Sequence, residues 1–131
     1  MADQAAQSGP QPGGFCHVEI AADDLERAKA FYGAAFGWTF QDVPMGEGQT
    51  YVIYQTGSGG VGGGIMTPPP GMPKMVVNYV LVEDVDAATA KIAAAGGTIV
   101  MPKTEVHGMG EMAHFTDPDG NHMAVWKSTH G

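Results

Sequence analysis

The chain has 131 residues, of which 44% are hydrophobic and 15% are charged, a balance typical of one globular domain rather than of a disordered chain. Fourteen acidic residues against six basic residues give a formal net charge of −8. This charge repels phosphate backbones and anionic headgroups, so it argues against nucleic-acid binding and against membrane binding. It is compatible with a small cationic ligand.

Three features predict a cytoplasmic protein. Cys16 is the single cysteine, so no disulfide can form within the chain, and a reducing compartment is the default. Residues 1–14 lack the basic and apolar segments of a signal peptide, and we interpret them as a disordered arm before one domain at 15–131. No apolar stretch reaches the roughly 20 residues that a membrane-spanning helix needs.

The first half of the domain reads as one strand, one helix and three strands. Residues 15–20 form a short strand-like run, and Asp23 with Glu26 forms an acidic capping box that predicts a helix start. Apolar residues then recur at helical spacing up to Phe36, and Gly37 suits the residue that ends a helix. Three strand candidates follow, at 38–43, 50–55 and 61–66.

The second half repeats this order after a proline-rich linker at 68–74. A strand is predicted at 75–82, a helix capped by Asp84 follows, and Gly96 with Gly97 ends it. Further strands are predicted at 98–101, 112–116 and 122–127, with a turn at 117–121. The sequence around Asp24 aligns with that around Asp84 at an offset of sixty, so we predict two βαβββ modules, at 15–67 and 75–128.

Several local sequences carry a family resemblance. In the first module they are His17-Val18-Glu19-Ile20, Asp24-Leu25-Glu26-Arg27-Ala28, Phe31-Tyr32 and Phe36-Gly37-Trp38. In the second they are Val80-Leu81-Val82, Asp84-Val85-Asp86, Gly96-Gly97 and Phe115-Thr116-Asp117-Pro118-Asp119-Gly120-Asn121. From residue 15 to residue 127 the chain resembles the vicinal-oxygen-chelate superfamily, which includes glyoxalase I, extradiol dioxygenases, bleomycin-resistance proteins and methylmalonyl-CoA epimerase. Within it, the chain is most similar to uncharacterised glyoxalase-like proteins.

The resemblance implies an α+β fold in which the mixed sheets of two βαβββ modules curl into a cup. It also implies a homodimer and, if the chain is an enzyme, an activity like that of lactoylglutathione lyase. In metal-dependent members, side chains in the cup hold a divalent ion that chelates two neighbouring oxygens of the substrate and acts as a Lewis acid.

The metal positions that the resemblance implies are mostly filled by residues that cannot bind a metal. His17 stands at the first ligand position, but Asn78 stands at the matching position of the second module and Ala124 replaces the carboxylate of the last strand. The fourth position falls within residues 62–65, which have no donor side chain. We therefore predict no metal or other cofactor. The alternative is a metal-dependent lyase, isomerase or dioxygenase with a rearranged ligand set, drawing on Glu19 beside His17, or on His107, Glu111, His114 or His122.

A small organic molecule is the predicted ligand of the cup. His17 and Glu19 share one face of their strand, and we predict that these two catalytic residues act as a base and the group that orients it, without a metal. The alternative is that these two side chains simply line a wet surface. The predicted ligand-binding residues combine polar groups with apolar walls; they are Tyr54, Met66, Asn78, His122 and Trp126.

Three functions stay open at this point. The chain could sequester its ligand, as bleomycin-resistance proteins do, or it could catalyse proton transfer or lyase chemistry. It could also be an interaction module that uses the fold without a ligand.

Overall fold

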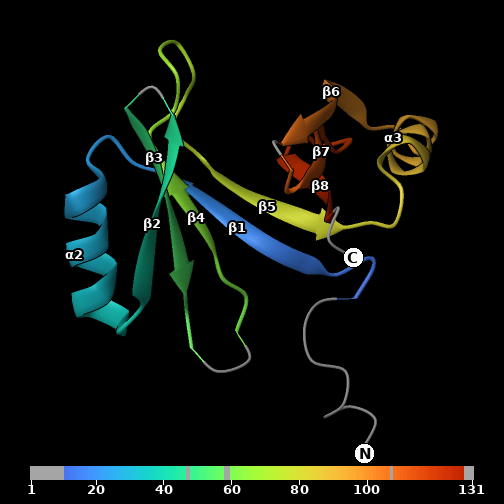
Figure 1. Cartoon of the computed structure of the whole chain (residues 1–131). Coiled ribbons are helices and arrows are strands. Elements are labelled where there is room, and N and C mark those ends of the chain that lie inside the picture. Colours follow the sequence, from blue (N-terminus) through green and yellow to red (C-terminus); the bar gives the residue numbers. More distant parts are fainter. Residues whose placement is uncertain (1–10, 47, 58–59, 107, 129–131) are drawn as a thin grey trace, which may run out of the picture. The chain divides into compact units, whose positions relative to one another are not determined.

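The computed structural model describes residues 11–46, 48–57, 60–106 and 108–128 (Figure 1). These residues form two compact units, which we call the first module (17–76) and the second module (11–16 with 77–128). Each module contains the predicted order of one strand, one helix and three strands. The elements of the first are β1 (Phe15–Ala21), α2 (Leu25–Phe36), β2 (Thr39–Gly46), β3 (Gln49–Gln55) and β4 (Gly63–Met66). Those that follow are β5 (Val76–Leu81), α3 (Val85–Ala94), β6 (Thr98–Val106), β7 (Gly110–Thr116) and β8 (His122–Ser128).

Both sheets have the same topology, which confirms the predicted α+β class and the repeat. The strand order is β2-β3-β4-β1 in the first module and β5-β8-β7-β6 in the second. In each, the first strand pairs in parallel with the last, and the other pairs are antiparallel. Ile20 pairs with Ile65 and Val80 pairs with Val125, so the registers of the two parallel pairs differ by the predicted offset of sixty.

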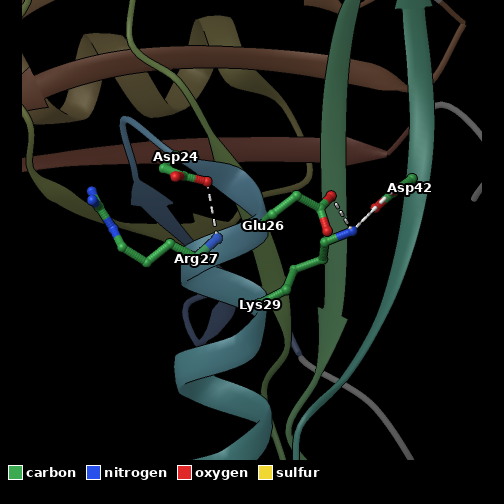
Figure 2. Close-up of polar contacts among 5 residues, drawn as sticks. All are labelled: Asp24, Glu26, Arg27, Lys29 and Asp42. Carbon is green, nitrogen blue, oxygen red and sulfur yellow. Dashed lines mark hydrogen bonds and ion pairs between the residues drawn. The ribbon is translucent and has the colours of Figure 1, made fainter.

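Both helices begin at an aspartate whose carboxylate accepts a backbone N–H of the first turn. The Asp24 carboxylate accepts from Arg27 and that of Asp84 from Ala87, each at 3.0 Å. Figure 2 shows the first cap and, one turn on, Lys29 placed between Glu26 and Asp42. The predicted capping box of Asp23 and Glu26 is therefore wrong. The cap lies one residue later, and Glu26 pairs with Lys29 at 2.9 Å.

We expect Asp84→Ala to lower the free energy of unfolding by about 1 kcal/mol, because the amide of Ala87 would lose its acceptor. Urea denaturation measures the change, and Glu83→Ala, one residue earlier and exposed, is the control. Equal losses in the two variants would show that the cap contributes nothing.

In each module the helix packs on one face of its sheet, and the buried residues gather there. Val52, Tyr54 and Ile65 are at most 2% exposed beneath α2, and the Trp38 ring stacks on Tyr54 with centroids 4.5 Å apart. Val85, Ala113 and Val125 form the corresponding core beneath α3. Strand positions that alternate with these core residues point away from the helix. We call the face that they form the distal face of each sheet.

Strand β6 continues to Val106, five residues beyond the predicted end at 101. This extension contains Pro102, which cannot donate a hydrogen bond to a sheet ladder. β6 lies at the end of the strand order in its module, and the register with β7 shifts between Met101 and Thr104. Proline is tolerated at such an edge, so the strand runs through it.

The predicted N-terminal arm is described only in part, since residues 1–10 lie outside the described ranges. Gly13 and Gly14 belong to the fold rather than to a disordered arm. The Gly13 N–H donates to the carbonyl of Leu81 at 2.8 Å, and the Gly14 carbonyl accepts the Leu81 N–H at 2.9 Å. Within the described part of the chain, neither helix is long and apolar enough to cross a membrane.

Candidate functional site

A hydrogen-bonded chain of His17, Tyr51 and Glu19 lies on the distal face of the first sheet. The Nε2 atom of His17 is 2.8 Å from the Tyr51 hydroxyl oxygen. That hydroxyl donates to Oε2 of Glu19 at 3.1 Å. The imidazole ring also stacks on the tyrosine ring, with an interplanar angle of 9°. The three side chains therefore form one continuous polar unit.

Strand alternation and one glycine place these groups together. His17 and Glu19 are two residues apart on β1, so they point to the same face, and β4 lies between β1 and β3. Gly64 of β4 pairs with Glu19 on one side and with Ile53 on the other. A Cβ atom at Gly64 would overlap the Tyr51 ring. The bare backbone of Gly64 thus allows a tyrosine on β3 to reach across β4 to β1.

The hydrogen bonds fix how protons are arranged when His17 is neutral. Tyr51 has one hydroxyl proton, and the contact with Glu19 uses it. The proton between His17 and Tyr51 must then sit on Nε2, which leaves Nδ1 of His17 unprotonated. Burial lowers the pKa of His17 below its usual value near 6.5, which favours the neutral ring. The arrangement is that of a neutral imidazole base backed by a carboxylate through a phenol.

The lowered pKa of His17 predicts that the protein loses stability as the pH falls. Below pH 6.5 the unfolded chain binds a proton at this histidine while the folded chain does not, so unfolding is favoured. As the pH falls, the loss of stability begins near pH 6.5 and ends at the lower pKa of His17 in the folded state. Between these two values the free energy of unfolding falls by up to about 1.4 kcal/mol per pH unit. Denaturation with a chelator present, between pH 5 and 8, should show a steeper decline for the parent than for His17→Gln. Parallel curves of stability against pH for the two proteins would contradict this prediction.

A small hollow lies along β2 and β3 of the first sheet. Its volume is about 170 Å³, and it is lined by Thr39, Phe40, Gln41, Ile53 and Gln55. Ile53 and Gln55 follow Tyr51 at alternate positions of β3, and Gln41 pairs with Ile53 across the β2–β3 ladder. Thr39, Gln41 and Gln55 supply uncharged hydrogen-bonding groups next to the apolar Ile53. The hollow suits a few atoms of an uncharged polar molecule.

A larger hollow of about 370 Å³ lies at the start of α2. Arg27, Phe31 and Lys74 are among the residues that line it, but His17, Glu19 and Tyr51 are not. Lys74 forms an ion pair with Asp23 at 2.6 Å. Although this hollow is the larger, it holds none of the candidate acid–base groups.

The chain matches the model of the glyoxalase/bleomycin resistance protein/dioxygenase superfamily over residues 14–125. The chain belongs to this superfamily. It is 36% identical over 115 residues to "Putative glyoxylase CFP32" of Mycobacterium tuberculosis, covering 85% of this chain and 44% of that protein. It is 30% identical over 130 residues to the anthracycline biosynthesis protein DnrV of Streptomyces peucetius, covering 88% of this chain and 47% of that protein. The chain thus spans about half the length of these two relatives.

Solved structures of the superfamily show the same fold. Methylmalonyl-CoA epimerase from Mycobacterium tuberculosis has a TM-score of 0.69 at 16% identity, covering 94% of this chain and 93% of that one. The epimerase from Streptomyces coelicolor, solved with 2-nitronate-propionyl-CoA, has a TM-score of 0.68 at 18% identity, covering 91% and 96%. At these identities the likeness concerns the fold alone.

The described residues do not form a metal site of the kind that the superfamily implies. Among the side chains that the structure describes, no group of three or more His, Cys, Asp or Glu residues could hold a metal ion. The donors next to Tyr51 are the imidazole of His17 and the carboxylate of Glu19, and the Tyr51 hydroxyl hydrogen bonds to both. The absence of a bound metal stays a prediction, and His107 lies outside the described residues.

The structure divides the predicted ligand-binding residues between different sheet faces. Met66 pairs with Ala21 and shares the distal face of the first sheet with Glu19. Tyr54 does not: it is 2% exposed in the core beneath α2, and its hydroxyl donates to the carbonyl of Val18 at 2.7 Å. Burial raises the pKa of Tyr54 to about 12.

In the second module, His122 and Trp126 lie on the distal face, because they alternate with the core residue Val125. Asn78 lies on the helix side of its sheet, because it alternates with Tyr79 and shares the face of the core residue Val80. Neither Tyr54 nor Asn78 therefore shares the distal face of its own sheet.

Tyr51 is the functional candidate that the sequence analysis missed. Two signals were present. Tyr51 lies an odd number of residues from Val52 and Tyr54, so its side chain points to the opposite face of the strand, and the glycines of β4 leave room for a large neighbour. Only the β3–β4 and β1–β4 registers show that this tyrosine crosses to β1.

Proposed function

We propose that the chain binds a small organic molecule on the distal face of the first sheet and that His17 transfers a proton to and from it. Tyr51 and Glu19 act as a relay behind the imidazole. The observation that carries this proposal is the continuous hydrogen-bonded chain from His17 Nε2 through the Tyr51 hydroxyl to Glu19 Oε2, at 2.8 and 3.1 Å.

The chemistry that this arrangement supports is removal of a proton from carbon next to a carbonyl group. Nδ1 of His17 takes the proton, and the electrons of the broken C–H bond move to the carbonyl oxygen and give an enediolate or enolate. The proton on Nε2 moves toward Tyr51 while the Tyr51 proton moves toward Glu19, so the new positive charge is neutralised by the carboxylate. Return of the proton to the opposite face of the same carbon completes an epimerisation, whereas its return to the neighbouring carbon of an enediolate completes an isomerisation.

Two further observations support an organic ligand of modest size. The small hollow along β2 and β3 offers the uncharged polar side chains of Thr39, Gln41 and Gln55 beside Phe40 and Ile53, which can hold a few atoms of such a molecule. Relatives named as a glyoxylase and as an anthracycline biosynthesis protein favour an organic molecule over a macromolecule. A cytoplasmic location and a homodimer stay predictions.

Ligand binding is tested by amide NMR spectra of the chain during titration with hydroxyacetone and dihydroxyacetone, which carry two neighbouring oxygens and acidic C–H bonds. We expect the largest shifts at Gln41, Ile53 and Gln55 beside the hollow. Tyr54→Phe is the control that should keep these shifts, because Tyr54 lies in the core beneath α2. Shifts confined to Arg27 and Phe31 would place the site at the other hollow, and no shifts would remove support for an α-hydroxy ketone ligand.

A further inference from the structure

The second module carries a different polar cluster on its distal face, formed by three neighbouring strands. His114 on β7 and His122 on β8 face each other, with Nδ1 of His114 only 2.8 Å from Nε2 of His122. On its other side, Nε2 of His114 is 3.3 Å from the hydroxyl of Tyr79 on β5. That hydroxyl in turn contacts the sulfur of Met112 at 3.8 Å. The proposed acid–base function uses none of these side chains.

One assignment of protons satisfies these three contacts together. Tyr79 donates its hydroxyl proton to Met112, so Nε2 of His114 donates to the Tyr79 oxygen. His114 is then protonated at Nε2, and Nδ1 has a lone pair that accepts the N–H of His122. Burial and the neighbouring His122 both lower the pKa of His114, which favours the neutral ring. One nitrogen of each imidazole ring thus faces the other ring.

We propose that His114 and His122 form a binding site for a transition-metal ion that prefers imidazole, such as Cu²⁺, Ni²⁺ or Zn²⁺. The ion replaces the proton between the two nitrogens, and His122 gives up its Nε2 proton by carrying it on Nδ1 instead. No redox change is needed. Imidazole nitrogen suits these ions, whereas Mg²⁺ and Ca²⁺ prefer oxygen ligands.

The distance between the nitrogens is close to what such an ion requires. Metal–nitrogen bonds of about 2.0–2.1 Å at a tetrahedral angle place two ligand nitrogens roughly 3.3 Å apart. The two nitrogens, now 2.8 Å apart, would need to separate by about 0.5 Å, and the rings, whose centroids now lie 5.1 Å apart, would need to turn so that both nitrogens face one ion. Both side chains are half-buried, so an ion can reach them from solvent. Water would complete the coordination, since no third His, Cys, Asp or Glu joins this pair among the described residues.

Tyr79 gives this histidine pair a hydrogen-bond partner of the kind found in metal sites. A metal-bound histidine commonly donates its other ring N–H to a partner that fixes the tautomer and the orientation of the ring. The Tyr79 hydroxyl fills this place for His114, because it accepts from Nε2 while Nδ1 faces His122. Tyr79 is therefore a positioning residue for the proposed ion.

The experiment is calorimetric titration of chelator-treated protein with Cu²⁺, Zn²⁺ and Mg²⁺, together with ¹⁵N spectra of the histidine rings. We expect one Cu²⁺ or Zn²⁺ per chain, tighter for Cu²⁺, with shifts in two ring systems and no response to Mg²⁺. His114→Gln and His122→Gln should each abolish the binding, and Tyr79→Phe should weaken it about tenfold. His17→Gln is the matched control and should bind as the parent does.

Three results would overturn the proposal. One is the absence of Cu²⁺ and Zn²⁺ binding in the parent. Another is binding that persists in both His114→Gln and His122→Gln. The third is binding that His17→Gln abolishes, which would locate the ion in the first module. Circular dichroism shows whether each variant keeps its fold. If a histidine variant has lost its fold, the metal affinity of Tyr79→Phe tests the proposal in its place.

Discussion

Tyr51→Phe is expected to slow deuterium exchange on dihydroxyacetone at least about 100-fold, which is the lower range for loss of acid–base assistance. The substitution keeps the ring stacked on His17 but removes the hydroxyl that joins Nε2 to Glu19. The proton arriving at His17 then has no path to the carboxylate. Proton NMR in D₂O follows the loss of the C–H signal over time.

Tyr54→Phe is the matched control for this prediction. Tyr54 lies on the same strand as Tyr51 but on the opposite face, and its hydroxyl donates to the backbone at Val18. We expect the exchange rate to stay near that of the parent, while the free energy of unfolding falls by about 1 kcal/mol for the lost hydrogen bond. Equal exchange rates in Tyr51→Phe and the parent would show that the relay has no role.

Ile65→Ala should produce the largest loss of stability, about 2–5 kcal/mol in the free energy of unfolding. Ile65 is fully buried beneath α2 in a cluster with Val52 and Tyr54, and the truncation leaves a cavity that the paired strands cannot close. Chemical denaturation measures the loss. Val61→Ala, at a position 39% exposed just before the same strand, should change the free energy by less than about 0.5 kcal/mol.

A small effect at Ile65 would mean that the packing beneath α2 is looser than the structure shows. An equally large effect at Val61 would mean that burial is not what separates the two positions. Either outcome would contradict the described core of the first module.

The sequence predicted the elements well because each signal was local. Gly37 ends α2 with a φ of 74°, a conformation that glycine adopts readily, so a single residue marked the end of the helix. The acidic residues ahead of both helices predicted their starts to within one residue. The repeat added independent support, since both parallel strand pairs reproduce its offset of sixty.

The candidate site depended on contacts between distant strands, which no local signal fixes. His17 and Tyr51 are 34 residues apart, and their contact requires the β1–β4 and β3–β4 registers together with the missing side chain at Gly64. Tyr54, the tyrosine predicted to bind the ligand, lies three residues after Tyr51, and a shift of three residues along a strand reverses the face. The prediction therefore missed the tyrosine that contacts His17. His114 and His122 illustrate the same limit, since the β7–β8 register decides that they meet.

The measurement that tests the central claim most directly is deuterium exchange on dihydroxyacetone by chelator-treated parent protein and by His17→Gln. We predict exchange above the buffer rate in the parent, unchanged by the chelator, and a loss of at least about 100-fold in His17→Gln. Exchange that is equal in the two proteins, or that appears only when a divalent metal is added, would contradict the role assigned to His17, Tyr51 and Glu19.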